Sequence, residues 1–360
     1  MERWIKIKTK PKVSPPIFYL NWENPKSYPN KHAEWLNEMP KNTKINFKKT
    51  INWKEFKSSV LVCGTFPEDK SEFIFYENDL PPCSDIPLLK SHLQKSIRRN
   101  KPDQAVKTAF NLMDLDFTHF IRRIIIIMIE DVYIHQSINT LTWIMLAIED
   151  WKPSKNHIEW LLGVVAFLAD TKYRIIHGRI DKLHTQTYFQ EISKINNSKY
   201  RSSLWSLLIR KSYGGMKGDM EMINHTIFKY LNEFQVNKDK KSLEYFHQKF
   251  KAVDTNLDKL MNNEWIPNAV DFHCCPNIIF MIQNNFWEEG FEDNDIKKAI
   301  WEFSSKITYK KELIEEEKQE EKESEPQQED EEIKNLENTW NIIKKEYIKI
   351  AFSILRKKIS

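Results

Sequence analysis

The sequence predicts a mainly α-helical protein: an irregular helical bundle with an extended N-terminal arm and one candidate β-hairpin. Two observations support this fold class. Apolar side chains recur every three or four residues over most of 85–305, and 41% apolar residues can supply a large core for a 360-residue chain. We expect four segments: 1–84, a basic arm rich in Pro and Trp; 85–305, a helical body; 306–333, an acidic disordered linker; and 334–360, a basic amphipathic helix.

The N-terminal arm contains six prolines between residues 11 and 40, which break any long helix there. Two later runs, Ser59–Cys63 and Glu72–Tyr76, have β character and are separated by turn residues, so they could pair as a hairpin. Over residues 1–57 the arm interleaves aromatic residues with 13 Lys and Arg, against 5 Asp and Glu. Such a surface can bind single-stranded nucleic acid, but aromatic side chains of a Pro-rich arm also pack onto a neighbouring domain. Packing is slightly favoured.

The helical body begins at Asp85, which can cap a helix, and Asp116 can cap another. The segment 116–132 is apolar on nearly every side after Arg122 and Arg123, which is typical of a central, buried helix. Apolar spacing predicts further helices. They are Ile138–Trp151, Asn156–Asp170, Arg201–Tyr213, Met220–Phe234, Leu243–Met261 and Asn277–Trp287.

The composition changes after Trp301. Residues 312–332 contain 12 Asp and Glu against 2 Lys and have too few apolar side chains to offset the entropy of ordering, which predicts a disordered linker. Beyond it, 334–360 combines apolar residues at helical spacing with 7 Lys and Arg against 2 Glu. This amphipathic helix could pack back on the body, bind a protein partner or contact an anionic surface. Packing back is favoured.

Three features indicate where the protein resides. Four cysteines are too few for a disulfide framework in a chain of this size, which suits a reducing compartment. The longest apolar runs, Ile124–Ile129 among them, are far shorter than the roughly 20 residues of a bilayer-spanning helix. Met1–Lys12 has no apolar stretch of the kind found in secretory signals. We therefore expect a soluble, intracellular protein of the cytoplasm or nucleus.

The most informative stretch is Leu89–Asp131. Its pieces His92–Arg99, Phe120–Arg123 and Glu130–Asp131, with Pro102-Asp103 between them, resemble the helical collar domain of replication-fork AAA+ ATPases of the clamp-loader clan, the MgsA and Werner-interacting type. In that family the collar follows the ATPase module and holds subunits together. The chain contains no Gly-rich phosphate loop of the Walker type, so the resemblance implies protein contacts without an ATPase.

A second resemblance concerns the whole chain. The collar-like segment, then YGGMKGD at 213–219, then AVDFHCCP at 269–276 follow one another as in proteins of nucleo-cytoplasmic large DNA viruses. The abundance of Lys, Ile and Asn would suit an AT-rich viral genome. This resemblance implies that the protein is found in a virus-infected host cell. It implies no particular activity.

The paired charges of the collar-like segment admit two interpretations. At helix ends they can lock neighbouring helices together, which is the favoured interpretation. Alternatively, the cations contact phosphates, and each contact adds salt-sensitive affinity. With one lysine from the glycine-rich loop described next, the candidate nucleic-acid-binding residues are Lys95, Arg98, Arg99, Arg122, Arg123 and Lys217.

The loop Tyr213–Asp219 holds three glycines. Its backbone N–H groups, with Lys217 above them and a helix N-terminus behind, could cradle a phosphate. A plain turn between two helices explains the same residues, with Gly214 at a helix C-cap and Asp219 at the next N-cap. The turn is favoured, because a short glycine-rich motif without a preceding strand is weak evidence for phosphate binding.

The segment 271–275 combines an acid, a histidine and two cysteines. A nearby imidazole can lower the pKa of a thiol and activate it, so Asp271, His273 and Cys274 are less favoured candidates for catalytic residues. A zinc site would need distant ligands such as His247 or Cys83, because adjacent cysteines lack zinc-ligand spacing. A buried, unreactive turn is favoured, and we expect neither a metal nor a cofactor.

Together these features favour a non-enzymatic accessory or scaffold protein of DNA replication, repair or packaging. It would bind protein partners through its collar-like helices and nucleic acid through its basic arms. One alternative is an enzyme that uses residues 271–275 and a phosphate contact at Lys217. Another is a structural or virion-associated protein. The sequence indicates neither the oligomeric state nor the identity of a partner.

Overall fold

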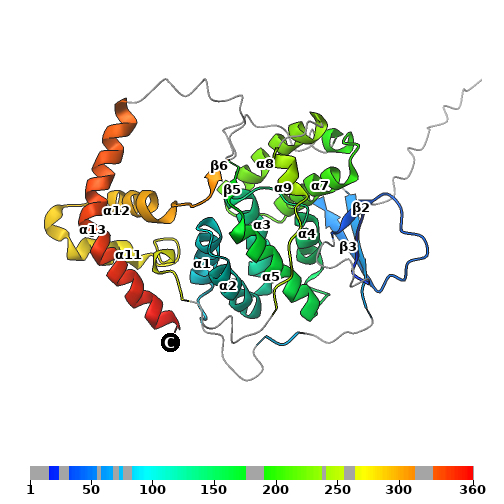
Figure 1. Cartoon of the computed structure of the whole chain (residues 1–360), viewed down its shortest axis with the longest axis horizontal. Helices are drawn as coiled ribbons and strands as arrows, with labels where there is room; N and C mark the ends of the chain where they lie inside the picture. Colours follow the sequence, from blue (N-terminus) through cyan, green and yellow to red (C-terminus); the bar gives the residue numbers. More distant parts are fainter. Residues whose placement is uncertain are drawn as a thin grey trace, which may run out of the picture.

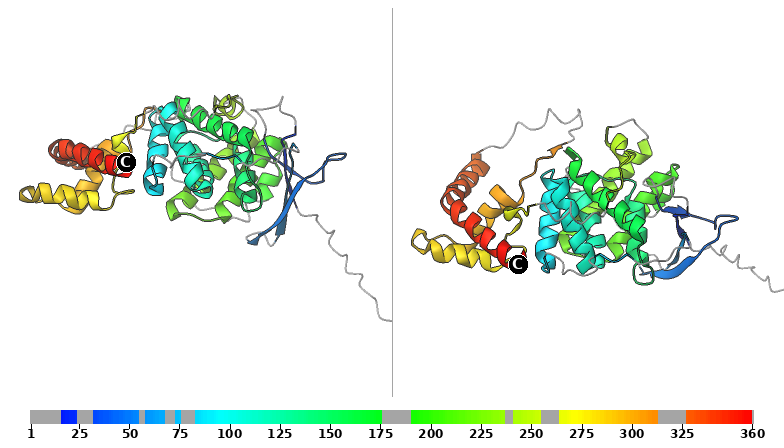
Figure 2. Two further views of the ribbon diagram at one scale, coloured as in Figure 1. Left: turned by 90° about the horizontal axis from the view of Figure 1, so that it is seen from below. Right: turned by 60° about the horizontal axis from the view of Figure 1, so that its bottom comes forward.

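The protein has three parts in a row, as the computed structural model in Figure 1 shows: a small β-sheet, a central helical body and a group of C-terminal helices. The views in Figure 2 keep this order. The predicted fold class, mainly α-helical, is confirmed. None of the described helices has the length and apolar character needed to cross a membrane. The structure describes residues 16–23, 32–54, 58–67, 73–75, 83–175, 190–236, 241–254, 264–312 and 327–359.

The four-stranded sheet has the order β2-β1-β4-β3, with β1 parallel to β4 and the other pairs antiparallel. The predicted hairpin is wrong in its pairing. Ser59–Cys63 does form most of a strand, but that strand pairs with two earlier strands, and 73–75, the described part of Glu72–Tyr76, is not a strand. The strands are β1 (Ile17–Asn21), β2 (Glu34–Leu36), β3 (Phe47–Trp53) and β4 (Ser58–Thr65).

The sheet packs on the helical body through aromatic side chains. Phe18 and Trp35 are buried and stacked, with ring centroids 4.4 Å apart. The indole N–H of Trp143 donates to the carbonyls of Phe18 and Cys63, at 3.1 and 3.0 Å. The prediction of an extended arm is therefore wrong for the described residues, which form a sheet. In the sheet these aromatic side chains bury more apolar surface than they would in an extended arm. Residues 1–15 lie outside the described residues.

The helical body follows the predicted helices closely. The carboxylates of Asp85 and Asp116 accept the N–H groups of Leu88 and His119, both at 2.7 Å, and so cap α1 and α3 as predicted. The run Ile124–Ile129 is buried at the centre of the body. The helices are α1 (Ile86–Arg98), α2 (Pro102–Leu115), α3 (Phe117–Asp131), α4 (Ile138–Ala147), α5 (Lys155–Asp170), α7 (Ser198–Ser212), α8 (Lys217–Val236) and α9 (Lys241–Phe246).

The predicted helix Leu243–Met261 is wrong over most of its described part. After α9 the chain runs through 247–254 without helix and lies against α5, where it buries Phe250. Gly163 of α5 permits this close approach, because a Cβ atom there would lie 2.4 Å from the carbonyl oxygen of Lys251. Packing on α5 thus replaces the expected helical turns. The end of the predicted helix lies outside the described residues.

The C-terminal helices form a separate layer beside α1 (Figure 1). The predicted amphipathic helix is confirmed as α13, which packs back on this layer and buries Ile343, Tyr347 and Leu355. The elements of the layer are η3 (Pro267–Ala269), α11 (Asn277–Asn285), η4 (Trp287–Glu289), α12 (Asp293–Ile300), η5 (Trp301–Ser305) and α13 (Gln327–Ile359).

The predicted linker begins later than expected. Residues 306–312 pack on the body and end in β6 (Lys311–Glu312), which pairs with β5 (Tyr173–Arg174). The buried ammonium of Lys310 donates to the carbonyl of Leu168 and to Asn100 Oδ1, both at 2.9 Å, and so stabilises the C-terminal end of α5. Residues 313–326 of the predicted linker lie outside the described residues, and 327–333 form the first turns of α13, so the prediction of disorder is wrong there as well.

Candidate functional site

A cavity of about 680 Å³ lies where α1, α3, α7 and α8 meet the C-terminal layer. Six cationic side chains and three carboxylates of described residues line it, so the cavity carries a surplus of positive charge. The cations are Lys90, Lys95, Arg98, Arg122, Arg123 and Arg210, and the carboxylates are Glu130, Asp219 and Asp271.

Two groups of candidates that are far apart in the sequence meet at this cavity. Those that line it are Lys95, Arg98, Arg122, Arg123, Asp271 and His273. Three other candidates do not line it. They are Arg99, Lys217 and Cys274.

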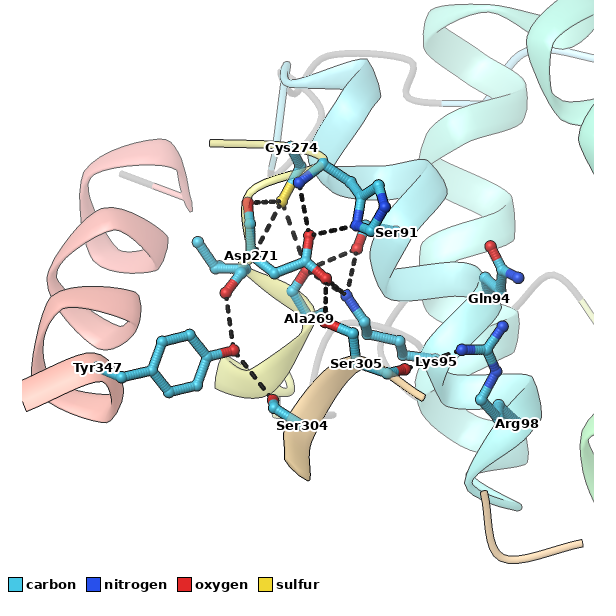
Figure 3. Close-up of polar contacts among 12 residues, drawn as sticks. Ser91, Gln94, Lys95, Arg98, Ala269, Asp271, Cys274, Ser304, Ser305 and Tyr347 are labelled. Atoms are coloured by element: carbon cyan, nitrogen blue, oxygen red, sulfur yellow. Dashed lines mark hydrogen bonds and ion pairs between the residues drawn. The ribbon is translucent and has the colours of Figure 1, made fainter. Parts of the chain in front are cut away.

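At one side of the cavity, Asp271 joins the body to the C-terminal layer (Figure 3). Its fully buried carboxylate accepts the ammonium of Lys95 and the hydroxyl of Ser305, the latter at 2.5 Å. The hydroxyl of Ser91 donates to the carbonyl of Ala269 at 2.6 Å. We call Ser91, Lys95, Asp271 and Ser305 the Asp271 junction.

The electrostatics of the Asp271 junction favour the ionised form of Asp271. Burial by itself would raise the pKa of Asp271, but the hydrogen bond from His273 and the charge of Lys95 hold that pKa well below its usual range. The backbone N–H of His273 also donates to the carboxylate, at 2.9 Å. Since these donors occupy both oxygens of Asp271, its carboxylate is a structural anchor.

Two arginines hold neighbouring elements in place: Arg98, the last residue of α1, and Arg99, its C-cap. Arg98 Nε donates to Asp131 at 2.5 Å, and Arg98 Nη2 donates to Glu130 at 3.1 Å, which joins α1 to α3. Arg98 Nη1 donates to the carbonyl of Ser305 at 2.8 Å, and Arg99 donates to the preceding carbonyl of η5 at 2.7 Å. This geometry agrees with the helix-locking interpretation of these charges.

At the opposite side, the remaining cations gather around the turn between α7 and α8. Arg122 Nη2 donates to the carbonyl of Tyr213 at 2.9 Å, and Arg210 Nη1 donates to the carbonyl of Gly214 at 2.9 Å. Gly214 has a φ of +70°, as expected for a glycine just after a helix. The glycine turn thus positions the guanidinium groups. We call Lys90, Arg122, Arg123 and Arg210 the arginine rim.

The arginine rim has little negative charge to balance it. Among the described residues, its one carboxylate contact within 4 Å joins Arg123 Nη1 to Asp219 Oδ2 at 3.8 Å. Burial and the neighbouring Arg122 lower the pKa of Arg210 to about 10, and burial and Arg123 lower the pKa of Lys90. A buried cation without a counter-charge costs free energy, so a bound anion would stabilise this region.

Two helix N-termini border the same cavity. Thr118 and His119 of the first turn of α3 line it, and so do Gly215 and Met216 just before α8. The N-terminal end of a helix carries partial positive charge and favours anions. Asp219 lies in the first turn of α8, so the prediction that it caps this helix is wrong, because the helix begins two residues earlier.

Two of the three catalytic candidates, Asp271 and Cys274, are held in structural contacts. Cys274 is buried, its thiol donates to the carbonyl of Ala269 at 3.4 Å, and burial raises its pKa, so the thiol stays protonated. Lys217, the expected phosphate contact, is 90% exposed and lies 4.0 Å from Glu221. In the part of the chain that the structure describes, no three His, Cys, Asp or Glu residues are grouped to hold a metal ion.

The residues of the cavity that the sequence reasoning missed include Lys90, Arg210 and Trp301. Arg210 ends a buried run in α7, as Arg122 and Arg123 interrupt one in α3, so the same signal could have identified it. Lys90 and Trp301 had no distinguishing signal, because only the packing of α1 against the C-terminal layer brings them to the cavity.

Comparison with family models, with curated proteins and with solved structures finds no match for this chain. The resemblance of residues 89–131 to a clamp-loader collar therefore stays a prediction. What bears on function is the chemistry of the cavity.

Proposed function

We propose that the protein is a non-enzymatic accessory protein of DNA replication, repair or packaging, and that it binds nucleic-acid phosphates at the arginine rim. The supporting observation is the surplus charge: among the described residues, one of the four rim cations contacts a carboxylate, Arg123 with Asp219 at 3.8 Å. Guanidinium groups match phosphate oxygens in geometry as well as in charge. If the protein acts in DNA replication, as its sequence predicts, nucleic acid is the phosphate-rich ligand that it would meet.

Two groups of segment 271–275, the carboxylate of Asp271 and the thiol of Cys274, do not support the enzyme alternative. A general base must reach the proton that it removes. The carboxylate of Asp271 is instead occupied by Lys95 and Ser305, and the thiol of Cys274 is buried and protonated. These groups support the role of an anchor that fixes the C-terminal layer.

The collar-like segment supports the scaffold part of the proposal. Its charges join α1 to α3 and to η5 through Arg98 and Arg99, which gives a rigid group of helices. A rigid helical group suits protein contacts, and the resemblance to a clamp-loader collar suggests that the partners belong to replication.

Salt-dependent binding tests the proposal. We would measure the affinity of the full chain for fluorescent single- and double-stranded DNA from low to moderate salt by anisotropy. Phosphate contacts release counterions, so the logarithm of the affinity should fall linearly with the logarithm of the salt concentration. Absence of measurable binding to both DNA forms at low salt would refute the proposal.

A matched pair of variants locates the contact. Arg122→Gln removes one rim cation and should weaken DNA binding about ten-fold, the size of one charge-assisted hydrogen bond. Arg356→Gln removes an exposed cation of α13 that does not line the cavity, and should leave the affinity nearly unchanged. Equal losses in the two variants would mean that the arginine rim is not the binding site.

A further inference from the structure

The cavity has an aromatic side as well as a cationic one. Trp301 lines it at the start of η5 and remains 41% exposed, although large aromatic side chains are usually well buried. The ring of His273, which also lines the cavity, meets Trp301 edge to face with centroids 5.6 Å apart. The exposed indole is thus available to a flat group that enters the cavity.

The Asp271 junction holds this aromatic side in place. Ser305 at the end of η5 donates to Asp271 (Figure 3). Arg98 of α1 and Arg99, its C-cap, donate to two carbonyls of the same η5 turn. Arg98 also joins α1 to α3, which carries Arg122. The aromatic side and the arginine rim are therefore held on one connected frame, and such preorganisation lowers the entropic cost of binding.

A nucleotide combines the two chemistries that the cavity offers. Its phosphate is an anion of the kind that arginines bind, and its base is a flat π-system that stacks on aromatic side chains. The volume of about 680 Å³ lies in the range of small-molecule sites, roughly 300–1,000 Å³. A base inside a duplex is stacked and paired, so the base that enters must be unpaired.

We propose that the cavity binds one unpaired nucleotide, with its phosphate at the arginine rim and its base against Trp301. This inference rests on the proposed function and adds a ligand class to it. It implies a preference for single strands over duplex DNA. A free nucleoside monophosphate offers the same chemistry as a nucleotide of a strand, so the test includes both.

The first experiment distinguishes the contribution of the base to the binding affinity from that of the phosphates. We would measure binding of oligothymidylate and of an abasic deoxyribose-phosphate strand of equal length at one salt concentration. The wild-type protein should bind oligothymidylate about ten-fold or more tightly than the abasic strand. Trp301→Ala should lose that difference and bind the abasic strand like the wild type.

Two further variants guard against a merely structural effect. Trp301→Phe keeps an aromatic face and should retain most of the preference for oligothymidylate. Trp287→Ala removes a tryptophan of η4 that is 74% exposed and does not line the cavity, and should behave like the wild type. If Trp301→Ala kept the full preference for oligothymidylate, the inference would be overturned. Salt-sensitive binding that Arg122→Gln weakens would leave the proposed function standing in that case.

Competition identifies the source of the nucleotide. Thymidine 5′-monophosphate should displace oligothymidylate at concentrations at which inorganic phosphate does not, because the base adds binding energy. Displacement at micromolar concentration would support a free nucleotide as ligand, and displacement only at millimolar concentration would support a strand. Equal potency of the monophosphate and inorganic phosphate would contradict the inference, since the base would then contribute nothing.

Discussion

The two sides of the cavity contain the same types of cationic residue but use them differently. In the Asp271 junction Lys95 pairs with the carboxylate of Asp271, and beside it Arg98 Nε lies 2.5 Å from the carboxylate of Asp131. In the arginine rim, Arg122 and its neighbours donate mainly to backbone carbonyls. The comparison suggests a distinction: a cation paired with a carboxylate stabilises the fold, and a cation without such a partner is available to bind an anionic ligand.

The largest effect should follow from breaking the Asp271 junction. Asp271→Ala leaves the ammonium of Lys95 buried without its carboxylate, so we expect a loss of about 3–5 kcal/mol in the free energy of unfolding. Urea unfolding followed by circular dichroism measures this loss.

Two controls accompany that variant. Asp219→Ala removes the carboxylate that lies 3.8 Å from Arg123 in the arginine rim, and should cost about 1 kcal/mol or less. Adding Lys95→Met to Asp271→Ala removes the uncompensated charge and should restore part of the stability. If Asp271→Ala and Asp219→Ala cost the same, the distinction between the two sides would be wrong.

Moderate acid should act on a buried histidine and not on the junction. The ring of His92 accepts the N–H of Ile266 at 2.8 Å and lies 2.6 Å from the hydroxyl of Thr108, and burial lowers its pKa to about 3. The unfolded chain binds a proton near pH 6.5 while the folded ring stays neutral. Stability therefore falls as the pH drops from 6.5 to 4, by about 3 kcal/mol for this group.

The variant His92→Gln checks the assignment. It should reduce the loss of stability between pH 6.5 and 4 in urea unfolding by about 3 kcal/mol, while the buried His32 and His135, whose pKa values burial also lowers, keep their own contributions. Asp271 remains ionised throughout this window, because the contacts that lower its pKa shift its protonation to more acidic pH. An unchanged pH dependence in His92→Gln would show that another group carries the acid sensitivity.

Inorganic phosphate should stabilise the protein through the arginine rim. At about ten times its dissociation constant, a ligand that binds only the folded state adds about 1.4 kcal/mol to the free energy of unfolding. The increase should be smaller in Arg122→Gln, where the general effect of the salt remains. Equal stabilisation of the variant and the wild type in thermal unfolding would exclude an anion site at the rim.

The smallest effect should come from Lys217. Its side chain is 90% exposed and is 4.0 Å from Glu221, so Lys217→Gln should change the stability by less than about 0.5 kcal/mol. DNA affinity should also stay within two-fold, since this lysine does not line the cavity. A loss as large as that of Arg122→Gln, measured by anisotropy, would restore the glycine loop as a phosphate cradle.

The sequence predicted the helices well because their signals are local. Asp85 and Asp116 cap α1 and α3 through hydrogen bonds to residues three positions later, and apolar spacing marks the buried faces. The sheet was missed because β1 and β4 pair over 44 residues of sequence, from Ile17 to Leu61, which no local pattern records.

The same limit applies to the cavity. Arg122 and Arg123 were identified from charges on an apolar helix, and Asp271 and His273 from a short segment rich in chemical groups. That these four residues face one cavity depends on how the C-terminal layer packs against α1, through contacts between residues more than 170 positions apart. Trp301 acquires its place in the cavity from that packing alone.

The most direct test of the central claim is the salt dependence of single-stranded DNA affinity in the double variant Arg122→Gln/Arg123→Gln. Each phosphate contact contributes about 0.7 to the slope of log affinity against log salt for a single strand. If these arginines are free for a ligand, the slope should become shallower by about 1.4 relative to the wild type. A slope and an affinity equal to those of the wild type would contradict the claim that the arginine rim binds phosphate.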